Sequence, residues 1–182
     1  GIVGIAGLAF FAAPRLVPLF FPGFTESLTA ETVLLTRIML LQPILLVIST
    51  LFGRILQTKG RFFMSAVSPL LYNLGIIIGI VFLEPLLGLS GLAWGVVLGA
   101  LLHALVQVPS VARTKLLPRA TLRMQWKELK HISLLSLPRT ASLAAGNVAS
   151  LVLLSLASSV GAGSVAIFTL ASNVQSVPLA IV

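Results

Sequence analysis

Four polar residues near the C-terminal end are the best candidates for binding chemistry, because they stand inside long apolar runs. They are Arg139, Asn147, Asn173 and Gln175. Polar side chains at membrane depth are costly without partners, so they often mark substrate pathways. The guanidinium of Arg139 suits an anionic head group, since it can donate to two phosphate oxygens at once. Two plainer interpretations stay open: Arg139 extends to the membrane surface, and the amides hold helices together.

Other polar residues in the apolar runs are expected to join helices. They are Gln42, Asn73, His103 and Gln107. We expect His103 to be a satisfied residue at a helix interface, with no second metal ligand nearby. Glycine pairs four residues apart predict close helix packing in the same way; they are Gly75/Gly79, Gly91/Gly95 and Gly95/Gly99. Arg15 and Arg37 are interpreted as anchors at the membrane interface, where Glu26 and Glu31 could pair with them.

The sequence offers few residues for catalysis. It contains two histidines, four acidic residues and no cysteine. The lack of cysteine excludes disulfides, thiol nucleophiles and zinc held by cysteine. No zinc-protease, hydrolase-elbow or phosphate-loop motif is present. We therefore expect no catalytic residue, no metal site and no resident cofactor.

The composition predicts an all-α, polytopic transmembrane helical bundle. Of the 182 residues, 58% are hydrophobic and 9% are charged, against roughly 25% charged in a soluble domain. Mean hydropathy is +1.12. The apolar runs are too long for strands of a membrane barrel. At about 20 residues a span, the chain holds about six spans.

The expected spans follow the apolar runs. Their ranges are 2–21, 33–51, 62–83, 92–108 and 132–160, and a sixth begins near 165. Short turns are expected at 84–91 and 161–164. Leu122, Trp126 and Leu129 have helical spacing within a basic stretch, which predicts a short amphipathic helix over 122–131 on the membrane surface.

The positive charge is concentrated in two loops. The net charge of the whole chain is +8. Residues 53–61 and 113–131 hold nine of its twelve lysines and arginines. The alternate turns at 22–32, 84–91 and 161–164 hold none. The positive-inside rule therefore predicts that both basic segments are cytoplasmic and that the first span runs outward. Such a charge pattern indicates anionic lipid next to the loops, and no nucleic acid as a partner.

The chain begins and ends within apolar runs, at Gly1 and Val182, and lacks an initial methionine. We expect it to be an internal part of a larger membrane protein.

The order of several short motifs resembles one family. The motifs are Ala13-Pro14, Pro22-Gly23-Phe24, Gln42-Pro43, Gly53-Arg54-Ile55-Leu56-Gln57, Arg61-Phe62, Ser68-Pro69-Leu70-Leu71-Tyr72-Asn73, Gln107-Val108-Pro109, Pro138-Arg139, Ala157-Ser158, Gly163-Ser164-Val165, Leu170-Ala171-Ser172-Asn173 and Val177-Pro178. This succession is similar to the MurJ (MviN) lipid II flippases of the multidrug/oligosaccharidyl-lipid/polysaccharide exporter superfamily. The resemblance covers essentially the whole chain.

The resemblance implies a fourteen-helix, two-lobe transporter of the bacterial cytoplasmic (inner) membrane. Residues 1–112 would complete the N-lobe as family helices three to six, 113–131 would link the lobes, and 132–182 would open the C-lobe. The implied activity is alternating access that moves lipid II, an undecaprenyl-pyrophosphate-linked saccharide, from the cytoplasmic to the outer leaflet. The implied partners are this substrate and membrane lipids. Coupling to the membrane potential or to Na+ is physically possible.

One departure from the family bears on the candidate site. Many members carry an alanine-aspartate-arginine run on helix eight, whereas this sequence has Ala171-Ser172-Asn173, and Ser176 replaces a following acid. Arg139 is our hypothesis for the substitute cation. Two alternatives remain open. One is another polysaccharide-lipid flippase or a drug exporter of the superfamily, although the span interiors lack the acids that a drug exporter needs. The other is a membrane-embedded enzyme or scaffold.

Overall fold

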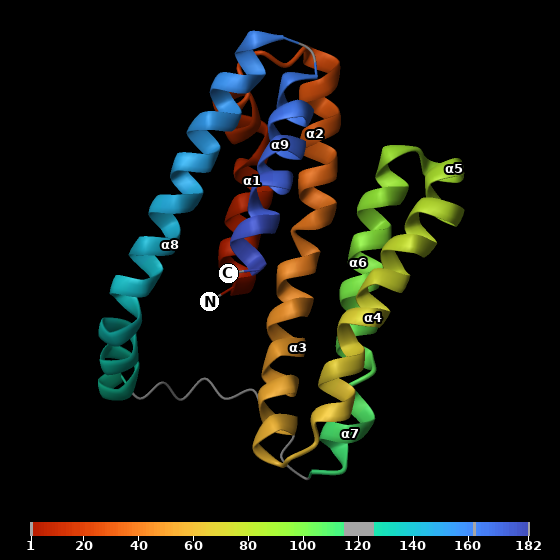
Figure 1. Ribbon diagram of the computed structural model, residues 1–182, viewed down its shortest axis with the longest axis vertical. Helices are drawn as coiled ribbons and strands as arrows, with labels where there is room; N and C mark the ends of the chain where they lie inside the picture. Colours follow the sequence, from red (N-terminus) through yellow and green to blue (C-terminus); the bar gives the residue numbers. More distant parts are fainter. Residues whose placement is uncertain (1, 115–125, 162, 182) are drawn as a thin grey trace. The chain divides into compact units, whose positions relative to one another are not determined.

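The computed structural model contains helices joined by short turns, and no strand, in the residues that it describes, which are 2–114, 126–161 and 163–181. Figure 1 shows the helices in chain order. Their bounds are α1 Ile2–Phe20, α2 Glu26–Met39, α3 Leu41–Thr58, α4 Phe62–Ile78, the π-helical turn η1 Gly79–Leu83, α5 Glu84–Leu87, α6 Leu89–Leu105, α7 Val108–Ala112, α8 Trp126–Val160 and α9 Ser164–Ile181. The all-α prediction is confirmed.

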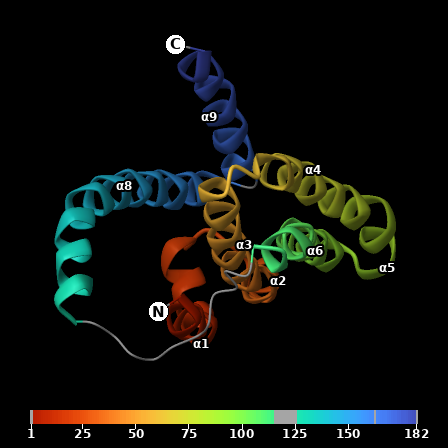
Figure 2. The same ribbon diagram turned by 90° about the horizontal axis from the view of Figure 1, so that it is seen from below.

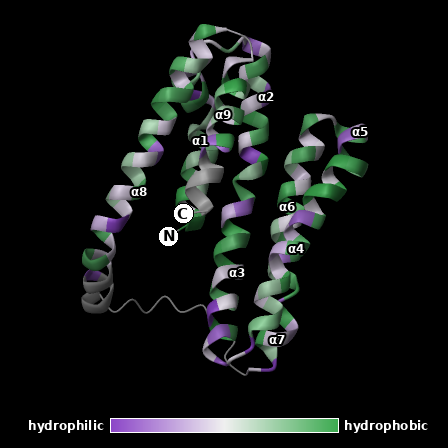
Figure 3. Cartoon of the chain, in the orientation of Figure 1, coloured by the Kyte–Doolittle hydropathy of each residue, from purple (hydrophilic) through white to green (hydrophobic). Residues whose placement is uncertain are grey.

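Five helical runs of the described residues are long and apolar enough to cross a membrane. They are Ile2–Phe20, Glu26–Thr58, Phe62–Leu87, Leu89–Ala112 and Ser133–Val160. Figure 3 shows that these runs consist mostly of hydrophobic residues. Each of these runs overlaps one of the first five expected spans. The sixth span was expected to begin near residue 165, and α9 begins at Ser164.

The second span is longer than expected and is divided. The sequence predicted a helix over 33–51, but α2 and α3 together reach from Glu26 to Thr58, with a turn at Leu40. Pro43 explains the division. It lies in the first turn of α3, where a missing N–H is harmless, but its ring excludes the carbonyl of Met39, the residue at which α2 ends.

The turn expected at 84–91 is much shorter in the structure. The helix continues through η1 and α5 as far as Leu87, and only Gly88 departs from it. Gly88 has a φ of +62°, a left-handed conformation that glycine adopts without strain. Pro85 does not end the helix because it falls in the first turn of α5.

The expected surface helix over 122–131 is not separate from the span that follows it. Residues 122–125 lie outside the described residues, but Trp126 to Val160 form one continuous helix. Figure 2 shows α8 changing direction within its N-terminal (teal) part. Pro138 lies there and removes one helix hydrogen bond, a common cause of bending. The predicted break between residues 131 and 132 is therefore absent, and α8 is one bent helix.

The described chain forms two compact units, 1–14 with 30–119 and 15–29 with 120–182. In the second unit, the loop after α1 meets the C-terminal end of α8. A Cβ on Gly23 would collide with the carbonyl group of Ser158, so only glycine fits there. The rings of Phe21 and Phe24 stack on either side of this turn, with their centroids 4.9 Å apart. The expected division at 112 and 131 stays a prediction.

In the first unit, α4 and η1 pack against α6 backbone to backbone. Gly75 faces Gly99, and Gly79 faces Gly95; a Cβ at any of these positions would collide with the opposing main chain. Gly91 packs in the same manner against the backbone of Leu83. Small residues let membrane helices approach closely and gain dispersion energy along their length. The predicted glycine packing is therefore confirmed, and it joins two neighbouring spans.

We predict that Gly79→Ala lowers the stability of the protein by about 1–3 kcal/mol, because the added methyl group must push α4 and α6 apart. The measurement is the midpoint of thermal unfolding of the purified protein in detergent. Gly146→Ala is the matched control, since a Cβ at Gly146 would have no neighbour within 4 Å. An unfolding midpoint for Gly79→Ala equal to that of the control would contradict the packing argument.

Candidate functional site

The N-terminal two-thirds of α8 carries polar side chains along one face. Ser136, Arg139, Thr140, Asn147 and Ser150 recur at the spacing that places them on one side of a helix. All five are exposed. The opposite side is apolar and includes Leu134, Ala141, Ala145 and Val148. Two of the four candidate residues, Arg139 and Asn147, therefore share this face, about 12 Å apart along the axis.

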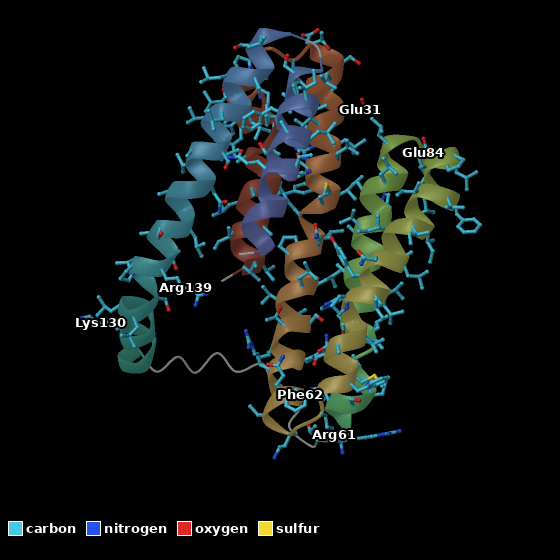
Figure 4. All side chains as sticks on the ribbon, in the orientation of Figure 1. Glu31, Arg61, Phe62, Glu84, Lys130 and Arg139 are labelled. Carbon is cyan, nitrogen blue, oxygen red and sulfur yellow. The ribbon has the colours of Figure 1, made fainter. Side chains whose placement is uncertain are left out.

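The candidate cation, Arg139, has an exposed side chain. Arg139 and Asn147 have no hydrogen-bond partner within the described part of the chain. Figure 4 shows that Arg139 and Lys130 leave the N-terminal part of α8 in different directions. Arg139 lies inside the run Ser133–Val160 that is apolar enough to span a membrane, whereas Lys130 precedes it. Arg139 is thus placed to offer a positive charge to a polar ligand beside α8.

The other two candidates, Asn173 and Gln175, both lie on α9 and are exposed. Residues two apart on a helix point to nearly opposite sides, about 200° around the axis. They therefore cannot both face a ligand that binds on one side of α9. Arg139 and Asn147 thus share a face of α8, whereas Asn173 and Gln175 lie on different faces of α9. The role of all four residues stays a prediction.

A buried polar cluster lies in the first unit, between α3 and the C-terminal end of α6. The Gln107 Nε2 atom donates to the Ser49 Oγ atom at 2.6 Å and to the His103 carbonyl at 3.1 Å. The Ser49 hydroxyl lies 2.5 Å from the His103 Nδ1 atom. Ser49 and Gln107 are almost fully buried, and Gln107 Oε1 has no partner among the described atoms. The interpretation of His103 as a satisfied interface residue is confirmed.

A second polar contact extends this pattern across three helices. The Gln42 Nε2 atom of α3 donates to the hydroxyl of Tyr72 on α4 at 2.8 Å. The ring of Tyr72 meets that of His103 on α6 edge to face, with the centroids 6.4 Å apart. Gln42 therefore also joins helices, as the sequence predicted. Ser49 and Tyr72 were missed, because a serine or tyrosine in an apolar run carries no signal of which helix it will face.

Arg37 bonds to the backbone of α1. Its Nε atom donates to the Phe10 carbonyl at 3.2 Å, and its guanidinium lies 4.8 Å from the centroid of the Phe10 ring. The Phe10 carbonyl is available because its helix donor would be residue 14, and Pro14 has no N–H. The expected ion pair of Arg37 with Glu26 or Glu31 does not form among the described residues. Arg37 instead supplies the hydrogen bond that Pro14 cannot donate to the Phe10 carbonyl.

Comparison with known proteins shows the family to which the chain belongs. Residues 2–182 match the family model described as lipid II flippase MurJ. The chain belongs to the MurJ family. It is also 27% identical over 187 aligned residues to the lipid II flippase MurJ of Burkholderia cenocepacia, in an alignment that covers 100% of this chain and 36% of that relative. The chain thus spans little more than a third of the length of the relative that it matches.

MurJ membership and the five apolar helical runs agree with the composition-based prediction of a polytopic membrane protein. Together they support a multi-pass protein of the bacterial inner membrane. The described residues contain no group of three or more histidine, cysteine or acidic side chains that could hold a metal ion. The geometry offers polar faces and helix contacts along spans, which suits binding and movement of a ligand.

We predict that Arg37→Met destabilises the protein by about 1–3 kcal/mol, the cost of leaving the Phe10 carbonyl without a donor. In a Pro14→Ala background, the backbone N–H at position 14 can bond to that carbonyl, so the same substitution should cost much less. The measurement is a double-mutant cycle on thermal unfolding in detergent. Equal costs in both backgrounds would show that Arg37 does not act through the Phe10 carbonyl.

Proposed function

We propose that the protein moves lipid II, an undecaprenyl-pyrophosphate-linked saccharide, from the cytoplasmic to the outer leaflet by alternating access. The observation that carries this proposal is the match to the lipid II flippase family over residues 2–182. The name of the Burkholderia relative supports the same substrate. The proposed activity is transport without a change of covalent bonds, in keeping with the few acids and histidines and the lack of cysteine.

In this proposal, the polar face of α8 contacts the head group during transport. Arg139 would hold pyrophosphate oxygens through its guanidinium, and Asn147, about two turns further along, would bond to the saccharide. The family resemblance implies that Asn173 on α9 stands where many members carry an arginine, so Arg139 would provide the cation that Asn173 does not. Either Asn173 or Gln175 could contribute a neutral amide, but not both from one side of α9.

Energy coupling is proposed on physical grounds. The pyrophosphate of the substrate is negative, and an inside-negative membrane potential favours its movement outward by about 2.3 kcal/mol for each charge at 100 mV. The membrane potential can therefore drive transport without a bound ion. Coupling to Na+ is the alternative, and it would need oxygen ligands from amides, hydroxyls and carbonyls of the spans.

We predict that Arg139→Ala lowers lipid II transport about tenfold or more, because a charge-assisted contact to phosphate is lost. The measurement has two parts: transport by the complete protein in proteoliposomes, and rescue of a strain depleted of its flippase. Lys130→Ala is the matched control, since it removes an exposed cation from the same helix. Normal transport by Arg139→Ala at normal expression would remove Arg139 from the site.

The same proteoliposomes separate the proposed substrate from its nearest competitor. A flippase for another polysaccharide-linked lipid would transport that lipid and leave lipid II in the inner leaflet. Transport of lipid II by the unmodified protein would favour the proposed substrate over this alternative.

A further inference from the structure

An open apolar groove lies in the first unit between α1, α2, α3 and α6. Its cavity volume is about 510 Å3, within the range of ligand pockets. Ala6, Gly7 and Phe10 line it from α1, Leu34 from α2 and Trp94 from α6. Arg37 is the one charged residue in its wall. Leu34 is half exposed, so the groove is accessible from the side of the helices.

The guanidinium of Arg37 is only partly used by the protein. Its Nε atom bonds to the Phe10 carbonyl, and the Phe10 ring covers one face. Within the described residues, no carboxylate neutralises the charge, and no hydrogen bond is made by either Nη atom. A cation in an apolar wall favours an anion strongly, because there is little water to screen it. The groove therefore combines a free forked donor with space for a hydrocarbon chain.

The depth of Arg37 places it near head groups of the outer leaflet. The positive-inside rule puts Arg54 at the cytoplasmic interface. Along the helical run Glu26–Thr58, the hydrocarbon core of about 30 Å corresponds to about 20 residues, which brings the opposite boundary close to Leu34. Arg37 then lies about one turn inside that boundary, within reach of a lipid phosphate through its long side chain.

We propose that this groove is a binding site for an anionic phospholipid of the outer leaflet. The phosphate is held by the two Nη atoms of Arg37, and one acyl chain lies against Gly7, Leu34 and Trp94. A saccharide-bearing lipid fits less well, since the many hydroxyls of a sugar would meet only two side-chain donors among the lining residues, the guanidinium of Arg37 and the indole N–H of Trp94. This inference does not rest on the proposed transport activity. Binding at this site ties α1 to α2 through the same arginine that bonds to Phe10.

The test is native mass spectrometry of the purified complete protein with phosphatidylglycerol or, separately, phosphatidylcholine as the added lipid. We expect phosphatidylglycerol to bind about tenfold more tightly, because it keeps a net negative charge beside Arg37, whereas the choline ammonium of phosphatidylcholine offsets the charge of the same phosphate and repels the guanidinium. Gly7→Leu should abolish that preference by filling the groove. Gly4→Leu is the matched control on the same helix, since a Cβ at Gly4 or at Gly7 meets nothing within 4 Å and only Gly7 lines the groove. Equal binding of the two lipids, or full binding by Gly7→Leu, overturns the proposal.

A second pair of variants separates charge from folding. In the Pro14→Ala background, Arg37→Met should lose the preference for phosphatidylglycerol, whereas Arg37→Lys should keep most of it. Retention of the preference by Arg37→Met overturns the assignment of Arg37. A photoreactive residue at position 7 identifies the occupant in membranes: a phospholipid adduct supports the proposal, and an adduct with a peptide or a lipid-linked saccharide overturns it.

Discussion

The structure depends on one constraint: within hydrocarbon, every main-chain N–H and C=O group needs a partner inside the protein. Proline violates this constraint because it leaves the carbonyl four residues earlier without a donor. At Pro14, the carbonyl of Phe10 is satisfied by Arg37 from the neighbouring helix. At Pro43, the helix divides at Leu40. The helix α8, which contains Pro138, continues as one helix while changing direction in its N-terminal part (Figure 2). Each of these three prolines therefore lies beside a local change in the structure.

Side-chain polarity follows the same logic in the first unit. Gln42, His103 and Gln107 bond across helices, and glycine contacts bring α4 and α6 close together. In the second unit, by contrast, Arg139 and Asn147 lie exposed on one face of α8 without partners among the described residues. Polar residues that bond across helices hold the first unit together, whereas the exposed polar residues of α8 remain the candidates for binding a ligand.

The sequence predicted the fold class and the first five spans because apolar runs of membrane length are unambiguous. It also predicted the glycine contacts and the interface role of His103, because small and polar residues within membrane spans commonly lie where helices meet. It failed at Glu84-Pro85, where proline in a first helical turn was mistaken for a turn signal. It failed at Arg37, because the partner is a backbone carbonyl exposed by Pro14 on another helix. Such pairings depend on which helices are neighbours, and one sequence does not contain that information.

The contact of Gly23 with Ser158 has a consequence for how such proteins can be recombined. The two residues are far apart in the chain, yet neither segment can change shape independently, because the turn of one fits against the main chain of the other. A chimera that exchanged only the turn after α1, or only the end of α8, would bring together surfaces that had not been selected for each other. Recombination between relatives should therefore succeed when both segments come from the same parent, and this contact defines a pair of positions that must be inherited together.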